Sequence, residues 1–195
     1  MNGAVTVKTY PAPAWGEREI WRYAGCPAPD PALHPLLREC IDEIAPALSY
    51  RMAYREFAVC TRDGALDLGF VTTDSTLLQR TLAGCDRLVL IAGTVGLAPD
   101  RLIRRYGSVA PTKAMFFQAI GAERIEALMD AATAEMADGR ALTPRVSPGY
   151  GDIPLAMQTD IFKALRCPDT IGLTLNDSLL MSPTKSVTAL IGVKR

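Results

Sequence analysis

The segment RVSPGYGDIP, residues 145–154, places an arginine, a tyrosine and an aspartate in a stretch that also holds two prolines and two glycines. An arginine guanidinium binds a carboxylate through two parallel N–H bonds. Proline fixes the backbone, glycine lets a ligand approach it, and Tyr150 offers an aromatic face to a flat ring or a cation. The residue types and their spacing predict a binding site for a small carboxylate.

Asp152 is expected to cap the helix that follows the segment, and the first N–H groups of that helix would add positive potential beside it. A small ligand that carries a carboxylate, a cation and a flat ring would use all of these groups. S-adenosylmethionine is one such molecule.

Side chains for other common chemistries are scarce. The single histidine, His34, lies in a proline-rich stretch without an evident base or nucleophile partner, which favours a surface or structural role. The five cysteines are widely spaced and never form a CxxC pair, so the sequence predicts reduced thiols and no metal site. RLVLIAGTVGLAPD lacks the full dinucleotide-binding glycine pattern and predicts a tight turn. We therefore predict no catalytic residues.

Composition restricts the class of protein further. The chain has 195 residues, of which 49% are hydrophobic, and its 21 basic and 21 acidic side chains cancel. Such a chain suits one compact domain, without the general positive field that attracts nucleic acid or an anionic membrane. The start of the chain does not have the pattern of a signal peptide. We expect a cytoplasmic protein.

The pattern of apolar residues predicts helices mixed with hairpin strands. Helices are expected near 17–24, 34–48, 74–83, 99–106, 111–137 and 154–166. Strands are expected in EFAVCTRDGALDLGFV, with a turn at Asp63-Gly64, and in RLVLIAG. IGLTLN and SVTALIGV should pair through a turn near Ser182-Pro183-Thr184. This mixture indicates an α+β domain with a largely antiparallel twisted sheet.

Three segments carry a resemblance to a known family. The run from Arg145 to Tyr150 resembles the R-x-x-P-G-Y signature of the C-terminal activation domain of cobalamin-dependent methionine synthase. IGLTLNDSLLMSPTKSVTALIG resembles the hairpin of that domain, and RIEALMDAATAEM is similar to its long helix. The likeness covers roughly residues 55–195 and is greatest to small stand-alone versions of the domain. It implies an activation-domain-like region at 51–195, with an N-terminal arm and helices, residues 1–50, packed on it.

In that family the domain binds S-adenosylmethionine and caps a corrinoid domain, whose oxidised cobalamin is then reduced by a flavodoxin-type donor and remethylated. The resemblance therefore implies a reactivation protein acting in trans on a corrinoid protein or a short cobalamin-dependent methionine synthase. Cobalamin would come only through the partner. The chain would be at most an accessory subunit, and not a methyltransferase alone.

The resemblance also assigns residues, position by position. Arg145 would bind the carboxylate of the ligand. The backbone around Ser147 would meet the adenosine, Pro148 and Gly149 would shape that backbone, and Tyr150 would pack beside the ligand. Each position matches the family's loop motif.

Two further candidates lie on helices. Glu126 falls on the acidic ligand-contacting position of the long helix, and Gln158 has helical spacing that directs its amide inward, where it needs a partner. Structural alternatives remain open for these positions. Arg145 could be paired with Glu126 or Asp152, Tyr150 could belong to the core, Glu126 could be a solvated charge, and Gln158 could be a buried structural amide.

The rival function is a non-catalytic module for another corrinoid protein, which senses S-adenosylmethionine or has only a structural role. Lys185 and Ser186 are candidates to face the corrinoid, although a lysine in a turn is typically solvated. Turnover of S-adenosylmethionine in the presence of partner and reductant would separate catalytic support from sensing.

Overall fold

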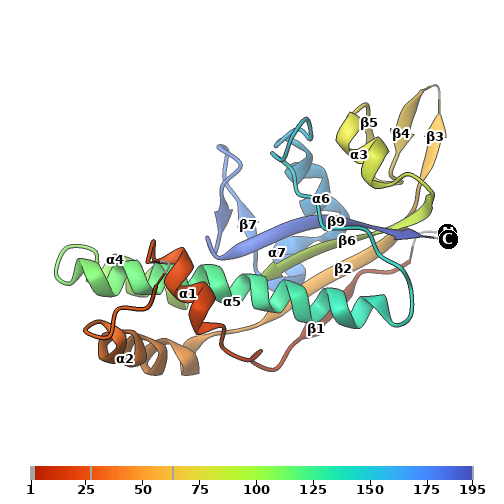
Figure 1. The fold of residues 1–195 in the computed structure, drawn as a ribbon. Helices are drawn as coiled ribbons and strands as arrows, with labels where there is room; N and C mark the ends of the chain where they lie inside the picture. Colours follow the sequence, from red (N-terminus) through yellow and green to blue (C-terminus); the bar gives the residue numbers. More distant parts are fainter. Residues whose placement is uncertain (1–2, 27, 63, 195) are drawn as a thin grey trace.

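The computed structural model describes residues 3–26, 28–62 and 64–194. Its main sheet is antiparallel throughout, and each strand pairs with its neighbour in the order β1, β2, β6, β9. The strands span Thr6–Thr9 (β1), Arg51–Ala58 (β2), Cys85–Thr94 (β6) and Ser186–Lys194 (β9). Together with the helices around this sheet, they confirm the predicted α+β class with a largely antiparallel sheet (Figure 1).

Helices cover both faces of the main sheet, because successive side chains of a strand point to opposite sides. Leu90 faces a core formed with α6 (Met157–Leu165) and α7 (Cys167–Ile171). Its neighbour Ile91 faces a second core formed with α5 (Pro111–Ala137). The strands are therefore apolar on both sides, which explains the continuous apolar run RLVLIAG.

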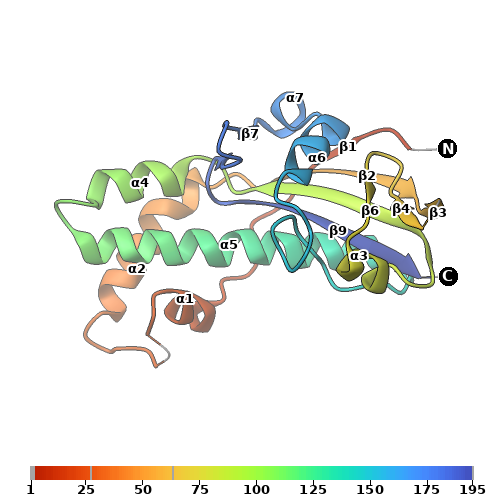
Figure 2. The ribbon, with the colours of Figure 1, turned by 90° about the horizontal axis from the view of Figure 1, so that it is seen from above.

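A third core lies beyond the sheet. Figure 2 shows α1 (Glu17–Tyr23), α2 (His34–Ile44) and α4 (Ala98–Tyr106) gathered around the first half of α5. Trp21 and Phe116 meet there edge to face, with 5.4 Å between ring centroids. The predicted division at residue 50 stays a prediction. Within the described residues, no helix has both the length and the apolar character needed to cross a membrane.

A small second sheet and a short helix follow β2. They comprise β3 (Cys60–Arg62), β4 (Ala65–Asp67), β5 (Thr72–Thr73) and α3 (Thr76–Thr81). Arg62 lies opposite Ala65 in the β3–β4 pair, and Gly64 between them has a φ of 82°, as the predicted hairpin requires. Asp63, the other turn residue, lies outside the described residues.

The predicted pairing of IGLTLN with SVTALIGV is wrong. Ile171 ends α7, and the short strand β7 (Thr174–Leu175) pairs with β8 (Met181–Ser182). The SVTALIGV segment, within β9, pairs instead with β6 in the middle of the molecule. The long apolar partner strand buries more surface than the short polar one, and local sequence order did not reveal this choice.

Candidate functional site

The segment before Arg145 is fixed along the edge of the main sheet. Val146 and Leu190 of β9 exchange backbone hydrogen bonds, with N···O distances of 3.1 and 2.8 Å. Thr143 donates its N–H to the carbonyl of Gly192 and accepts the N–H of Gly192 on its hydroxyl. Arg145 therefore lies on an ordered strand-like edge, and its side chain leaves from a defined backbone position.

The chain then turns sharply through its glycines. Gly149 and Gly151 have φ values of 85° and 60°, which favour glycine because it lacks a Cβ. The N–H of Gly149 donates to the carbonyl of Ile153, and the N–H of Tyr150 donates to the carbonyl of Ser147. This compact turn raises Tyr150 to the surface, where 67% of the residue is exposed. The alternative that Tyr150 belongs to the core is excluded by this exposure.

Asp152 caps a different helix from the one expected. Its carboxylate accepts hydrogen bonds from the hydroxyls of Ser75 and Thr76 and from the backbone N–H groups of Thr76 and Leu77, at the start of α3. These bonds hold the pKa of Asp152 well below its usual range. The prediction that Asp152 caps the following helix is wrong, because α3, which lies far upstream in sequence, is packed beneath the loop.

Arg145 reaches from the sheet edge to α5. Its Nη1 donates a hydrogen bond to Thr133 Oγ1 at 3.2 Å, and its Nη2 donates one to Glu126 Oε2 at 3.1 Å. Nη1 also lies 2.8 Å from Asp130 Oδ1, where the two side chains form an ion pair. The two hydrogen bonds use two of the five N–H groups of a guanidinium. With respect to the described residues, the Nε–H and one Nη2–H stay available for another acceptor.

A hollow opens on the loop side of Arg145, with a volume of about 510 Å³, which lies within the range of small-molecule sites. Its walls come from α5, from the loop and from β9. The lining residues are Glu126, Thr133, Thr143, Pro144, Arg145, Val146, Ser147, Tyr150, Val187 and Ala189.

A smaller hollow of about 290 Å³ lies on the other side of Arg145, toward α1. It shares Arg145 and Glu126 with the first hollow. Its wall, which is largely acidic, is completed by Glu19 and Tyr23 of α1 and by Glu123, Ala127 and Asp130 of α5. The guanidinium therefore separates two spaces, one beside the aromatic loop and one rich in carboxylates.

The predicted site residues fall into two groups. Glu126, Arg145, Ser147 and Tyr150 line the larger hollow together. Three others are absent from its lining: Pro148, which is buried, Gly149 and Gln158. Gln158 is 6% exposed, and its Oε1 has no hydrogen-bond partner among the described residues. The expected inward direction of this amide is observed, while its role stays a prediction.

Some lining residues were not anticipated. Asp130 and Thr133 lie four and seven positions after Glu126, so they share one side of α5. That spacing was visible in the sequence once Glu126 was chosen. Glu19 and Tyr23 carried no comparable signal, because only the packing of α1 on α5 brings them to the site.

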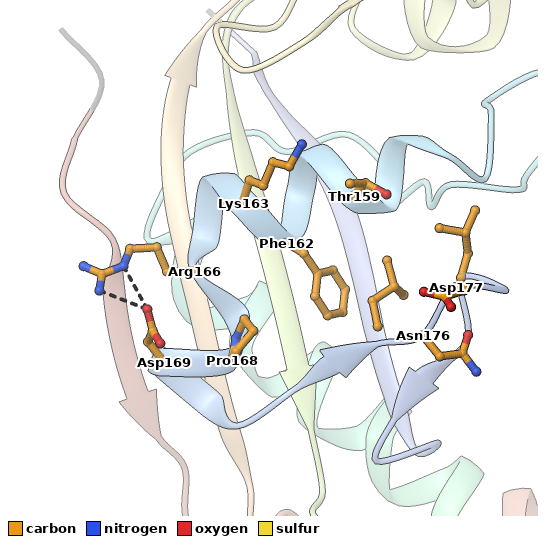
Figure 3. A pocket seen from close by; sticks show the side chains of 10 residues that line it. Thr159, Phe162, Lys163, Arg166, Pro168, Asp169, Asn176 and Asp177 are labelled. Carbon is orange, nitrogen blue, oxygen red and sulfur yellow. Dashed lines mark hydrogen bonds and ion pairs between the residues drawn. The ribbon is translucent and has the colours of Figure 1, made fainter.

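A larger cavity of about 640 Å³ lies between α6, α7 and the β7–β8 connection (Figure 3). Phe162 points into the cavity, and Arg166, the arginine among its lining residues, is paired with Asp169 at 3.0 Å. Its lining among the described residues includes none of the residues 145–154. Size alone favours this cavity, but the combination of Arg145, Tyr150 and nearby carboxylates favours the smaller one for an amphoteric ligand.

Comparison with solved structures identifies the architecture. The chain is similar to the MetH reactivation domain bound to AdoHcy, with a TM-score of 0.68 and 15% sequence identity. The match covers 97% of this chain and 78% of the other. This chain has the fold of the MetH reactivation domain. No family model matches the sequence, and no curated protein matches it.

The fold match confirms the resemblance noted in the sequence, and because it covers 97% of the chain it also takes in the first fifty residues, which lie outside the sequence likeness. At 15% identity the likeness establishes the fold, and the assignment of ligand contacts rests on the side chains of this chain.

Proposed function

We propose that this protein binds S-adenosylmethionine beside Arg145 and acts in trans on a separate corrinoid methyltransferase, with methionine synthase as the first candidate. It would support the reductive remethylation of that partner's cobalamin. One observation carries the proposal. Arg145 is held between an aromatic loop and a row of carboxylates, on a chain with the fold of a reactivation domain that binds AdoHcy.

The residues fit this ligand. Within the described chain, the Nε–H and one Nη2–H of Arg145 make no hydrogen bond, and they can donate to the ligand's carboxylate as a charge-assisted pair. Glu126 and Asp130 offer carboxylates to its ammonium and sulfonium groups. The exposed ring of Tyr150 and the backbone at Ser147 lie in the same hollow and suit the adenosine.

The methyl transfer requires little acid–base catalysis from the protein. S-adenosylmethionine supplies a methyl group on a sulfonium, and the group that leaves is a neutral thioether, which needs no proton. The residues of this chain would bind and orient the ligand and exclude water, which is catalysis by proximity. The shortage of histidine and the predicted lack of catalytic residues agree with this role.

The partner would have to meet the ligand beside the loop. Tyr150 and Leu155 are 67% and 43% exposed, and a Cβ on Gly149 would lie 3.4 Å from Leu155 Cδ1. Exposed apolar side chains beside a ligand hollow suit contact with another protein. A corrinoid protein would dock over this loop, and a flavodoxin-type reductant would supply its electron.

A reconstituted reactivation assay tests the proposal. Purified protein, a cobalamin-dependent methionine synthase without its own activation domain, and a flavodoxin-type reductant are mixed with S-adenosylmethionine, and formation of the thioether product is measured. Product should form only when every component is present. Arg145→Ala should abolish it, whereas Arg140→Ala, at an arginine that pairs with Glu56 outside the site, should not.

The outcomes separate the functions. Binding of S-adenosylmethionine that changes affinity for the partner, without turnover in the complete mixture, would replace reactivation by sensing. An Arg145→Ala protein as active as the wild type would remove the loop from the mechanism.

A further inference from the structure

One side of α5 forms a polar row beneath Arg145. Glu126, Asp130 and Thr133 are spaced by four and three residues, so they point the same way on the helix. All three contact the Arg145 guanidinium, at distances between 2.8 and 3.2 Å. The chain's own carboxylates are therefore already paired with the guanidinium that would also receive the carboxylate of the ligand.

The charges near Arg145 do not cancel. Glu19 pairs with Arg22 at 2.7 Å, and Glu123 pairs with Arg124, so these two carboxylates are neutralised within their own pairs. Glu126 and Asp130, among the described residues, pair only with Arg145. Two carboxylates then share one guanidinium, which leaves the immediate site with a net charge of −1.

The contact of Asp130 is the one most easily exchanged. Its side chain is 72% exposed, compared with 44% for Glu126 and 23% for Arg145. An ion pair with one member so exposed is weak, because water competes for both charges. A ligand carboxylate that binds Arg145 can take over the pairing of its charge from Asp130 at small cost, and the displaced Asp130 keeps its charge inside the site.

We propose that Asp130 is a specificity-determining residue that makes the site prefer the cationic sulfonium ligand to its neutral thioether product. This inference rests on the proposed function. After the exchange, Arg145 pairs with the ligand's carboxylate, and Asp130 and Glu126 face the ligand's ammonium and sulfonium. S-adenosylmethionine, with a net charge of +1, then balances the site.

The demethylated product lacks one of these charges. S-adenosylhomocysteine keeps its ammonium and carboxylate but has an uncharged sulfur, so one carboxylate of the row loses its partner. The product is therefore held less tightly than the methyl donor. Loss of the methyl group itself would favour release of the spent ligand.

Calorimetric titrations of S-adenosylmethionine and S-adenosylhomocysteine into three proteins test the inference. The wild type should bind the sulfonium ligand more tightly. Asp130→Asn keeps the shape and removes the charge, and it should lower the ratio of the two affinities by about fivefold, the effect of one partly screened charge pair. Glu135→Gln, which removes the same charge further along α5 at the Lys8 pair, should leave the ratio unchanged.

An analogue with an ammonium in place of the sulfonium separates charge from shape, and it should bind like S-adenosylmethionine. A wild type that prefers the thioether, or an unchanged ratio in Asp130→Asn with both ligands still bound, would overturn the inference and leave the proposed function intact. A wild type that binds neither ligand would overturn both.

Discussion

At the scale of single residues, the charged groups of the loop have different tasks. Arg145 faces the hollow and keeps N–H groups for a ligand, whereas Asp152 faces away and fastens the loop to α3. A Cβ on Gly151 would lie 2.8 Å from Leu77 Cδ2, so the loop and α3 are in close contact there. Asp152 thus positions the loop that presents Arg145 and Tyr150.

Asp152→Asn should weaken the attachment of the loop and lower the melting temperature at neutral pH. In the folded protein the pKa of Asp152 lies below its ordinary value of 3.8, because the hydrogen bonds favour the carboxylate. The stabilisation is therefore present above pH 3.8 and is lost as the pH falls from there toward the lowered pKa. Thermal unfolding of both proteins measures the difference across this range.

The variant Asp177→Asn, on the β7–β8 connection, is the matched control for Asp152→Asn. It should melt like the wild type at every pH. A difference between Asp152→Asn and the wild type that persists undiminished well below pH 3.8 would show that the carboxylate charge is not the stabilising feature.

At the scale of elements, α5 connects the core to the site. Leu128, Met129 and Ala132 are fully buried against the main sheet, while the polar row beneath Arg145 occupies another side of the same turns. Packing of the apolar side fixes the rotation of the helix, and that rotation aims Glu126 and Asp130 at Arg145. The site is therefore held on a rigid element and not on a loop alone.

The first half of α5 also supports the turn before β9. Lys185 is buried, and its stem lies on Gly121, where an added Cβ would lie 2.8 Å from Lys185 Cγ. Burial lowers the pKa of Lys185, and the charge of Asp100 opposes this shift. The hydroxyls of Ser186 and Thr94 are hydrogen-bonded to each other within the protein. The expectation of a solvated turn lysine is wrong, because Gly121 leaves room for it.

Gly121→Ala should destabilise the protein by about 1 kcal/mol, because overpacking typically costs more than alanine gains over glycine in a helix. In a Lys185→Ala background the same change should be neutral or stabilising, since the obstructing stem is gone. A double-mutant cycle by urea denaturation measures the coupling. Equal effects of Gly121→Ala in both backgrounds would contradict the close contact.

At the scale of the whole molecule, a buried ion pair ties the N-terminal segment to α5. Arg124 is fully buried and pairs with Glu123 while donating to the carbonyls of Pro13 and Ala14 at 2.8 and 2.7 Å. Glu123 accepts the N–H of Gly16 at 3.0 Å. These bonds place α1, and with it the acidic wall beside Arg145, so the N-terminal segment belongs to the site.

Glu123→Ala should destabilise the protein by about 3–5 kcal/mol, because it leaves the buried Arg124 without its counter-charge. Glu135→Ala, which breaks the exposed pair with Lys8, should cost less than about 1 kcal/mol. Urea denaturation compares the two. Limited proteolysis should also cleave the Glu123→Ala protein faster than the wild type in the segment that precedes α1. Equal stabilities of the two variants would contradict the anchoring role.

Local patterns were enough to predict part of this architecture. The length of α5 followed from its helical period, and Arg145 with Tyr150 followed from a short motif. Local patterns could not predict the contacts between segments that are distant in the sequence. The capping of α3 by Asp152 and the choice of β6 as partner for β9 both depend on which surfaces meet in the folded chain. The helical spacing of Asp130 from Glu126 could be read from the sequence, but the pairing of its carboxylate with Arg145 could not.

The most direct test of the central claim is a calorimetric titration of the purified protein with S-adenosylmethionine, beside Arg145→Ala and the control Arg140→Ala. We predict that the wild type and Arg140→Ala bind alike. Loss of the charge-assisted carboxylate contact in Arg145→Ala should cost about 2–3 kcal/mol, near a hundredfold in affinity. Binding that is unchanged by Arg145→Ala, or no binding by the wild type at millimolar ligand, would contradict the claim.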